Sequence, residues 1–353
     1  MLSPSDPAVF VTGATGFLGR HLVPRLLNGG RRVVVLVRRR GPLSAAQRTV
    51  EGFGELADRL EVLEGDIAFP EALEKTLDRL RSTIATVIHC AGETSFSAGA
   101  LNPTRVIHVD GPLALLGMLA GRGLRRWCHI STAFVCGRRS GIVREIDSDV
   151  GQPFHNSYER LKLQSEIAFK QACRELEIDL RILRPTIIVG AAPATSGGAP
   201  SNLLRAFVRL LVSVAGSADR RDGPIRVRGL PHARFNIVPV DYVAAAIERL
   251  AEDPGASGGT FHVAAANAPT QQEILDMLGG FLDLPELRLL GPQEMLPSPS
   301  SLELKIQKML LPYKAYLEQD VQFDCAGAYR LLHTHSVRVP GIRSEIERLI
   351  ERA

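Results

Sequence analysis

The feature that most restricts the fold of this chain is a glycine-rich segment between an apolar run and a helical pattern. This segment, residues 12–19 (TGATGFLG), is called the glycine loop below, and it directly follows the apolar run Ala8–Thr12. Gly13 permits a tight turn, Gly16 lets backbone N–H groups approach a pyrophosphate, and Gly19 lets a helix pack closely on a strand. The N-terminus of that helix favours an anion. The alternative interpretation is a turn that binds no ligand.

Short apolar runs rich in β-branched residues alternate with helical patterns over the first half of the chain. Such runs are typical of strands that are buried on both faces. The predicted strands are Ala8–Thr12, Arg32–Val37, Leu60–Glu64, Thr86–Cys90, Trp127–Ser131 and Leu180–Leu183. The predicted helices between them are Phe17–Leu27, Pro70–Leu80, Pro112–Ala120 and Tyr158–Glu175. This order predicts an α/β fold with a Rossmann-type, doubly wound parallel sheet.

The alternation stops after Arg184-Pro185. A loop is predicted at Gly190–Pro200, which is rich in Ala, Gly, Pro, Ser and Thr. The elements predicted beyond it are a helix at Asn202–Val214, a strand pair formed by Ile225–Arg228 and Phe235–Pro239, a helix from Val240, a helix through Phe281 that begins with a Thr270/Glu273 capping box, and a helix at Arg343–Arg352. We predict a Rossmann domain at residues 1–190, with 235–268 returning to it, and a smaller C-terminal substrate-binding lobe from 191–234 and 269–353.

Composition excludes several classes of protein. The 353 residues carry a formal net charge of only +4, without an acidic or basic tail, so no nucleic-acid partner is expected. The five cysteines are widely spaced and form no CxxC pair, which predicts neither disulfides nor a metal site and favours a reducing compartment. No apolar stretch reaches the roughly 18 residues of a membrane span, and no secretory signal begins the chain. The expectation is a cytoplasmic protein.

Tyr158 and Lys162 lie four residues apart, on one face of a predicted helix. The chain has five tyrosines and six lysines among 353 residues, and random placement gives about 0.1 such pairs. An ammonium beside a phenol stabilises the phenolate and lowers the phenol's pKa toward the working range of an acid or base. The alternative is a surface pair without a chemical role.

The glycine spacing and the Tyr-x-x-x-Lys pair together resemble the extended branch of the short-chain dehydrogenase/reductase superfamily, over roughly residues 8–268. The resemblance implies that Tyr158 exchanges a proton with the substrate and that Lys162 also holds the nicotinamide ribose. Aligning Val135-Cys136-Gly137 with the family's Val-Tyr-Gly places Thr132 at the catalytic hydroxyl, with Ser131 as the second candidate. His108 stands where the family usually has Asn, either as a hydrogen-bonding or proton-relay group or as a core histidine.

The same resemblance implies a set of cofactor contacts that follow the carboxyl ends of the strands. Asp66-Ile67 would contact adenine, Cys90-Ala91-Gly92 would close the fourth strand, and Pro185-Thr186-Ile187 would line nicotinamide. The predicted cofactor-binding residues are Gly13, Thr15, Gly16, Phe17, Leu18, Gly19, Arg20, Arg38, Arg39, Asp66, Ile67, Cys90, Ala91, Gly92, Lys162, Pro185, Thr186 and Ile187.

Arg38-Arg39-Arg40 stand where NAD-selective sites place an acid about 20 residues beyond the glycines. Guanidinium groups bind phosphate in a bidentate fashion, and Arg20 offers a further contact. NADP(H) is therefore the preferred cofactor, with NAD(H) still possible. The alternative is a solvated basic loop.

Two segments resemble fatty acyl reductases and thioester reductase domains. They are Val87–Ser97, which contains the predicted substrate-binding residues Thr94, Ser95 and Phe96, and Phe235–Val243. The apolar stretches Leu203–Val214 and Leu302–Leu317 suit an acyl chain, a carrier-bound thioester or simply a core. Lys305, Lys308 and Lys314 suit an acidic carrier protein, a membrane surface or solvent.

The leading hypothesis is an NADPH-dependent reductase of an acyl thioester, aldehyde or ketone. The first alternative is a nucleotide-sugar epimerase or dehydratase with tightly bound NAD, and the second is a non-catalytic NAD(P)-binding protein. A homodimer is expected only by analogy with the superfamily.

Overall fold

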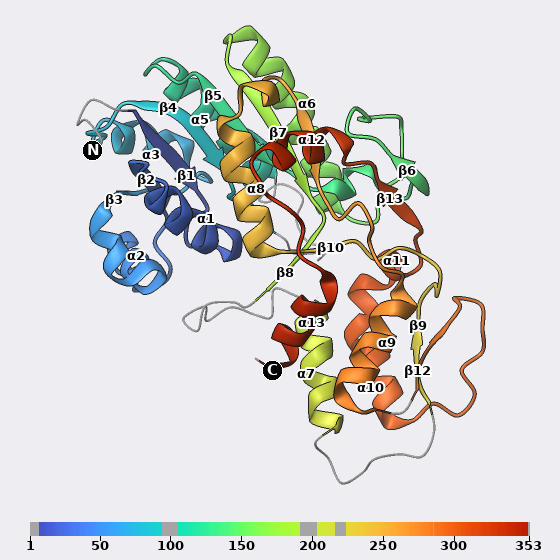
Figure 1. Cartoon of the computed structure of the whole chain (residues 1–353). Helices are drawn as coiled ribbons and strands as arrows, with labels where there is room; N and C mark the ends of the chain where they lie inside the picture. Colours follow the sequence, from blue (N-terminus) through green and yellow to red (C-terminus); the bar gives the residue numbers. More distant parts are fainter. Residues whose placement is uncertain (1–6, 94–104, 191–202, 216–223, 285, 352–353) are drawn as a thin grey trace.

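The computed structural model describes residues 7–93, 105–190, 203–215, 224–284 and 286–351 (Figure 1). Its centre is a seven-stranded sheet with the strand order β11-β7-β5-β4-β1-β2-β3, in which every neighbouring pair is parallel. The strands are β1 (Ala8–Thr12), β2 (Val33–Val37), β3 (Leu60–Glu64), β4 (Ile84–His89), β5 (Arg126–Ile130), β7 (Asp179–Pro185) and β11 (Thr260–Val263). The predicted doubly wound sheet is confirmed, and β11 adds a strand to the six that were predicted.

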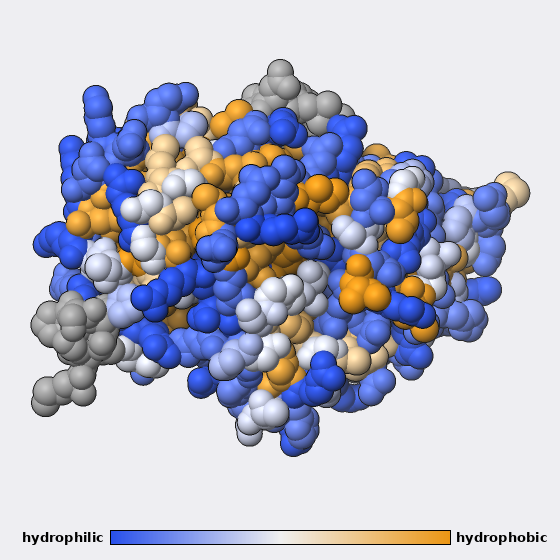
Figure 2. Space-filling view, turned by 90° about the horizontal axis from the view of Figure 1, so that it is seen from above, coloured by the Kyte–Doolittle hydropathy of each residue, from blue (hydrophilic) through white to orange (hydrophobic). Residues whose placement is uncertain are grey.

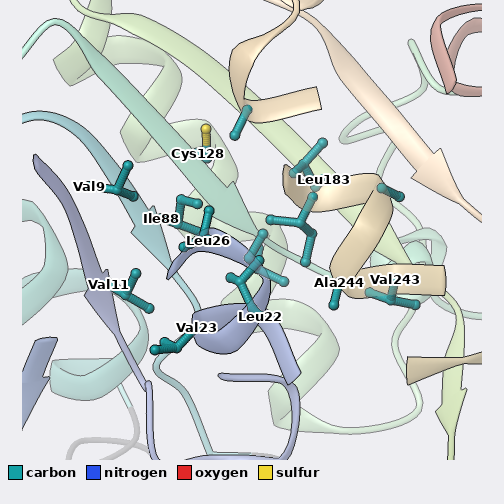
Figure 3. Close-up of a cluster of buried hydrophobic side chains, with 14 of the residues drawn as sticks. Val9, Val11, Leu22, Val23, Leu26, Ile88, Cys128, Leu183, Val243 and Ala244 are labelled. Carbon is teal, nitrogen blue, oxygen red and sulfur yellow. The ribbon is translucent and has the colours of Figure 1, made fainter. Parts of the chain in front are cut away.

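Helices cover both faces of this sheet. One face packs against α1 (Phe17–Asn28), α2 (Ala45–Phe53) and α8 (Val240–Glu252), and the other against α3 (Pro70–Leu77), α5 (Gly111–Ala120) and α6 (Ser157–Glu175). Alternate strand residues point to opposite faces, so Val9 and Val11 join the first core while Ala8 and Phe10 join the second. Figure 3 shows Val9 and Val11 of β1 beside Leu22, Val23 and Leu26 of α1.

Helix α2 was not predicted, because its buried face carries little aliphatic surface. Its buried residues are Ala45, Thr49 and Phe53, which share one face at four-residue spacing. A capping box formed by Ser44 and Gln47 begins the helix. The sequence signal for α2 was therefore its capping box rather than an apolar stripe.

A third core lies in the C-terminal part of the chain. The elements around it are α7 (Leu203–Ala215), β9 (Ile225–Arg228), α9 (Gln271–Leu282), β12 (Leu287–Leu290), α10 (Ser301–Leu310), α11 (Lys314–Leu317) and α13 (Ile342–Glu351), and we call them the C-terminal lobe. The predicted Thr270/Glu273 capping box begins α9 and is confirmed. The domain boundaries derived from the sequence stay a prediction.

The predicted pairing of Ile225–Arg228 with Phe235–Pro239 is wrong. β9 pairs in parallel with β12, while β10 (Ile237–Pro239) pairs in parallel with β8 (Ile187–Val189). Both segments are strands, but each finds a partner that is distant in sequence, a choice that strand patterns alone do not determine.

The last part of the chain returns from the lobe to the sheet. β13 (Val321–Phe323) pairs with β6 (Gly141–Val143), and α12 (Ala326–Thr334) packs on α8 and β11. Five short helical turns complete the structure: η1 (Gly54–Arg59), η2 (Val106–Asp110), η3 (Ala133–Cys136), η4 (Pro254–Ala256) and η5 (Leu311–Tyr313).

Hydrophilic residues predominate on the face seen in Figure 2, and apolar residues lie between them. None of the helices in the described ranges combines the length and the apolar content that a membrane crossing requires.

Candidate active site

The glycine loop lies at the point where the strand order reverses. From β1 the chain builds β2 and β3 on one side of the sheet and β4, β5 and β7 on the other, so a crevice is expected at the carboxyl end of β1. Gly13 adopts φ +70°, and a Cβ there would lie 2.6–2.8 Å from the backbone of Cys90 and Ala91. A Cβ at Gly19 would collide with the backbone of Gly13 and Ala14. The N-terminus of α1 carries neither a capping side chain nor an acidic residue, which fits a pyrophosphate.

Arginines surround the outer side of the glycine loop. Arg20 Nε donates to the Thr15 carbonyl at 3.0 Å, and Arg48 of α2 donates to Thr15 Oγ1 at 2.7 Å. Arg48 also donates to the Arg38 carbonyl, which fixes its guanidinium beside the turn after β2. Burial and the positive charges of Arg38, Arg40 and Arg20 lower the pKa of Arg48. Such a concentration of guanidinium groups is chemically suited to binding an anion such as a phosphate.

Arg48 is the residue of this cluster that the sequence reasoning missed. It was overlooked because α2 was overlooked. The Ser44/Gln47 capping box would have placed Arg48 in the first turn of a helix that follows β2. Of the predicted arginines, Arg38 and Arg39 are more than half exposed, and each lies near an acid, Asp66 at 3.8 Å and Glu64 at 3.4 Å.

Lys162 and its neighbours form the inner part of the site. Lys162 is 5% exposed, and its Nζ donates to the Ile130 carbonyl at the end of β5, at 2.7 Å. A Cβ placed on Gly92 would lie 3.0 Å from His108 Cε1 and 3.8 Å from Lys162 Nζ, so the ends of β4 and α6 meet here. Burial lowers the pKa of Lys162 to about 8, although Glu166 and Cys90 oppose the shift.

Tyr158 is half-buried, and its ring lies edge-on to the His108 ring, with centroids 5.6 Å apart. Burial raises the pKa of the Tyr158 phenol, and the carboxylate of Glu159 raises it further. The sequence predicted a shift in the opposite direction, caused by Lys162. That prediction is wrong for the chain without a bound cofactor, because burial dominates. A raised pKa keeps the phenol protonated at ordinary pH and also makes it a weaker acid, so proton donation depends on a nearby positive charge that stabilises the phenolate.

The two candidate hydroxyls at the end of β5 differ in their surroundings. Ser131 Oγ donates to Glu166 Oε1 at 2.5 Å, and the same carboxylate forms a buried ion pair with Arg184 at 2.6 Å. Within the described ranges, Thr132 Oγ1 accepts a long bond, 3.3 Å, from Phe134 N at the start of η3. Because η3 packs against α6, Thr132 lies beside the helix that carries Tyr158. Thr132 is therefore the better candidate for a substrate contact.

His108 is only partly satisfied by the protein. Its Nε2 lies 3.0 Å from the Glu93 carbonyl, whereas its buried Nδ1 has no partner in the described part of the chain. Burial lowers the pKa of His108 to about 3, and the positive charge of Lys162 adds to this effect. The ring is therefore neutral at ordinary pH and offers a nitrogen toward Gly92 and Lys162. These contacts differ from those of a fully satisfied core histidine.

The other predicted contacts lie along the carboxyl edge of the sheet. Asp66 Oδ1 accepts a bond from Ala68 N at 3.0 Å, and Ile67 is buried. Cys90 and Ala91 face the glycine loop, and burial raises the pKa of the Cys90 thiol to about 12. The Thr186 hydroxyl, between Pro185 and Ile187, donates to Asn236 Oδ1 at 3.0 Å. Thr94, Ser95 and Phe96 lie outside the described residues.

Comparisons with known proteins agree with this geometry. The model of the NAD-binding family described as male sterility protein matches residues 11–247. The chain belongs to this family, within the extended short-chain dehydrogenase/reductase superfamily of NAD(P)-dependent oxidoreductases and epimerases. The resemblance drawn from the sequence motifs is confirmed.

Individual relatives fall into two functional groups. UDP-glucose 4-epimerase 4 of Oryza sativa subsp. japonica is 30% identical over 211 residues, which cover 56% of this chain and 54% of the relative. The NRPS-like oxidoreductase fscA of Fusarium equiseti is 27% identical over 59% of this chain and 20% of its own length. A thiolation-reductase di-domain from an archaeal non-ribosomal peptide synthetase has a similar structure, with a TM-score of 0.76 and 19% identity over 98% of this chain and 74% of that one. The chain thus spans about half or less of the length of these two curated relatives.

Proposed function

We propose that this protein is an NADPH-dependent reductase that reduces an acyl thioester, or the aldehyde or ketone related to it. The observation that carries this proposal is the geometry around Tyr158, a phenol that keeps its proton beside the buried Lys162, at the edge of the sheet where the glycine loop also lies. A protonated phenol beside an ammonium that can stabilise the phenolate is suited to protonating a carbonyl oxygen.

The residues divide the chemistry among them. A bound nicotinamide cofactor supplies the hydride that reaches the carbonyl carbon. Tyr158 donates its phenolic proton to the carbonyl oxygen, and Thr132 donates a hydrogen bond to the same oxygen. Lys162, anchored on the Ile130 carbonyl, binds the cofactor's ribose and places a positive charge where phenolate forms. The glycine loop binds the pyrophosphate.

Selectivity for NADP(H) is assigned to the arginines around Thr15. Arg48 and Arg20 already point to the loop, and Arg38 and Arg39 follow β2. No acidic residue occupies the turn after β2, and an acid there would repel a 2′-phosphate. This cluster supports NADP(H) over NAD(H).

A carrier-bound acyl thioester is the proposed form of the substrate. The relatives named as an NRPS-like oxidoreductase and as a thiolation-reductase di-domain support this choice. The outer side of α10 and the start of η5 add a surface on which a carrier protein can dock, with Leu304 51% and Leu311 67% exposed and with Lys305 and Lys308 beside them.

The test is a side-by-side assay of NADPH consumption with acyl-CoA thioesters, acyl-loaded carrier protein, aldehydes, ketones and nucleotide sugars. We expect consumption with the acyl compounds and with NADPH in preference to NADH. Tyr158→Phe should abolish turnover and leave cofactor binding intact. Undiminished turnover of this variant would remove Tyr158 from the mechanism.

A nucleotide-sugar epimerase is the second candidate, because a UDP-glucose 4-epimerase is among the relatives at 30% identity. Such an enzyme would hold NAD tightly and would consume no net cofactor. NAD that copurifies with the protein, together with epimerisation of a nucleotide sugar, would favour this candidate over the reductase.

A further inference from the structure

Tyr316 of the C-terminal lobe reaches the beginning of the helix that carries Tyr158. Its hydroxyl donates to Glu159 Oε1 at 2.5 Å and accepts from Asn156 Nδ2 at 2.7 Å. Asn156 is the N-cap of α6, and its side chain accepts from Glu159 N at 3.0 Å. Tyr316 therefore binds residues on both sides of Tyr158 in sequence.

The ring of Tyr316 contacts the other half of the candidate active site. It packs edge-on against Phe134, with centroids 5.0 Å apart and planes at 84°. Phe134 lies in η3, the turn for which Thr132 is the N-cap. One side chain thus touches the turn that presents Thr132 and the helix start that presents Tyr158.

The carboxylate of Glu159 explains why this contact needs a hydroxyl. Glu159 is fully buried, and a buried carboxylate is costly unless several donors surround it. The donors are Tyr316 Oη, His155 N at 2.9 Å, the His155 ring at 3.2 Å and, at a longer 3.5 Å, Asn156 Nδ2. Removing the hydroxyl of Tyr316 takes away the short charge-assisted bond. Glu159 Oε1 then keeps the longer contacts with Asn156 and with the His155 ring, so we expect the first turn of α6 to rearrange.

The last residue of α11, Leu317, is hydrogen-bonded to the rest of the C-terminal lobe. The Leu317 carbonyl accepts from Leu230 N at 3.2 Å and from Gln271 Nε2 at 3.0 Å. Gln271 is the first residue of α9, and Leu230 follows β9 closely. Tyr316 is therefore held by the lobe through the residue next to it, and a shift of the lobe would move its hydroxyl.

We propose that Tyr316 is a positioning residue that couples the C-terminal lobe to the Thr132–Tyr158 pair, so that the pair reaches its working geometry only when the lobe is seated against α6. This proposal rests on the proposed reductase function. It extends that function because occupation of the lobe by substrate would be transmitted to the proton donor. A displacement of about 1 Å in a reacting group can lower a rate by about 100-fold.

The test compares Tyr316→Phe with Tyr329→Phe, a control on α12 whose tyrosine is 37% exposed. We expect Tyr316→Phe to lower kcat by about tenfold or more and to keep the KM for NADPH within about twofold of the wild-type value. The control variant Tyr329→Phe should have the kcat and KM of the wild type. Hydrogen–deuterium exchange should increase in peptides that cover residues 132–137 and 155–162 of Tyr316→Phe only. Phenylalanine preserves the packing on Phe134, so this variant is expected to fold.

The outcomes separate this proposal from the proposed function. If the wild type turns over and Tyr316→Phe matches it in kcat, the coupling is overturned, even if the melting temperature falls, because that pattern describes a purely structural contact. If the wild type turns over no carbonyl substrate, the proposed reductase function is wrong. The hydrogen–deuterium exchange experiment alone then tests the coupling through Tyr316. Greater exchange at 132–137 and 155–162 then supports the coupling, and unchanged exchange overturns it.

Discussion

The acidity of Tyr158 is set by its burial and by the residue next to it, not by its motif partner alone. Burial raises the pKa of the phenol, and Glu159 raises it further, while the ammonium of Lys162 binds the Ile130 carbonyl. The four-residue spacing selected the two residues that we propose to act on the cofactor and the substrate. It did not determine the direction of the pKa shift, because burial depends on elements distant in sequence.

Replacing Glu159 by Gln should lower the pKa of Tyr158. The amide carries no charge, so the phenolate is less disfavoured, while the amide oxygen still accepts the bond from Tyr316. Since the proposed mechanism uses the protonated phenol of Tyr158, the fall of kcat at alkaline pH should move to lower pH. The measurement is the pH profile of kcat at saturating NADPH, with Glu175→Gln at an exposed position of α6 as control. If the alkaline fall of kcat stays at the same pH or moves to higher pH, the role assigned to Glu159 is contradicted.

Among the elements, α1 depends on close contact with the turn before it. A methyl group at Gly19 would collide with the backbone of Gly13 and Ala14, whereas Gly280 on the exposed side of α9 has open space around it. Gly19→Ala should destabilise the protein by about 1–3 kcal/mol and weaken cofactor binding. Gly280→Ala should stabilise it by up to about 1 kcal/mol, because alanine favours helix. Thermal unfolding of both variants with and without NADPH tests these expectations. Equal changes in melting temperature for Gly19→Ala and Gly280→Ala would contradict the close packing of Gly19 on the glycine loop.

Helix α2 brings Arg48 to the glycine loop. The contact of Arg48 with Thr15 therefore depends on the position of the whole helix and not on a sequence motif. Arg48→Ala removes a guanidinium that donates to Thr15 and to the Arg38 carbonyl. Charge-assisted hydrogen bonds contribute about 1.5–3 kcal/mol, so the KM for NADPH should rise by about tenfold or more. The KM for NADH should change little. Arg81→Ala, an exposed position before β4, is the control. A parallel rise for both cofactors would show that Arg48 does not contact the 2′-phosphate.

At the scale of the whole molecule, the lobe presents a basic and apolar surface around Leu304, Lys305, Lys308 and Leu311. Lys305→Glu combined with Lys308→Glu should raise the KM for an acyl-loaded carrier protein, because complementary charges steer association and like charges oppose it. The effect should shrink with added salt, and the KM for the corresponding CoA thioester should not change. Lys75→Glu with Arg79→Glu, at exposed positions in α3 and just after it, is the matched control. Equal changes for both substrates would argue against carrier docking here.

The sequence by itself determined the local features of this protein. The glycine loop, the six predicted sheet strands within two residues of their ends, α6 with Tyr158 and Lys162, and the capping box of α9 follow from spacing and from residue type. These features depend on neighbours within one turn or one strand, and local chemistry is therefore enough to predict them.

Only the tertiary structure decided which distant segments meet. It paired β9 with β12 rather than with β10, engaged Ser131 with the buried Glu166, and brought Arg48 to Thr15. It also placed Tyr316, separated by 157 residues from Glu159, at the start of α6. Such contacts are selected by the burial and hydrogen bonding of the whole chain, and no periodicity within a single segment records them.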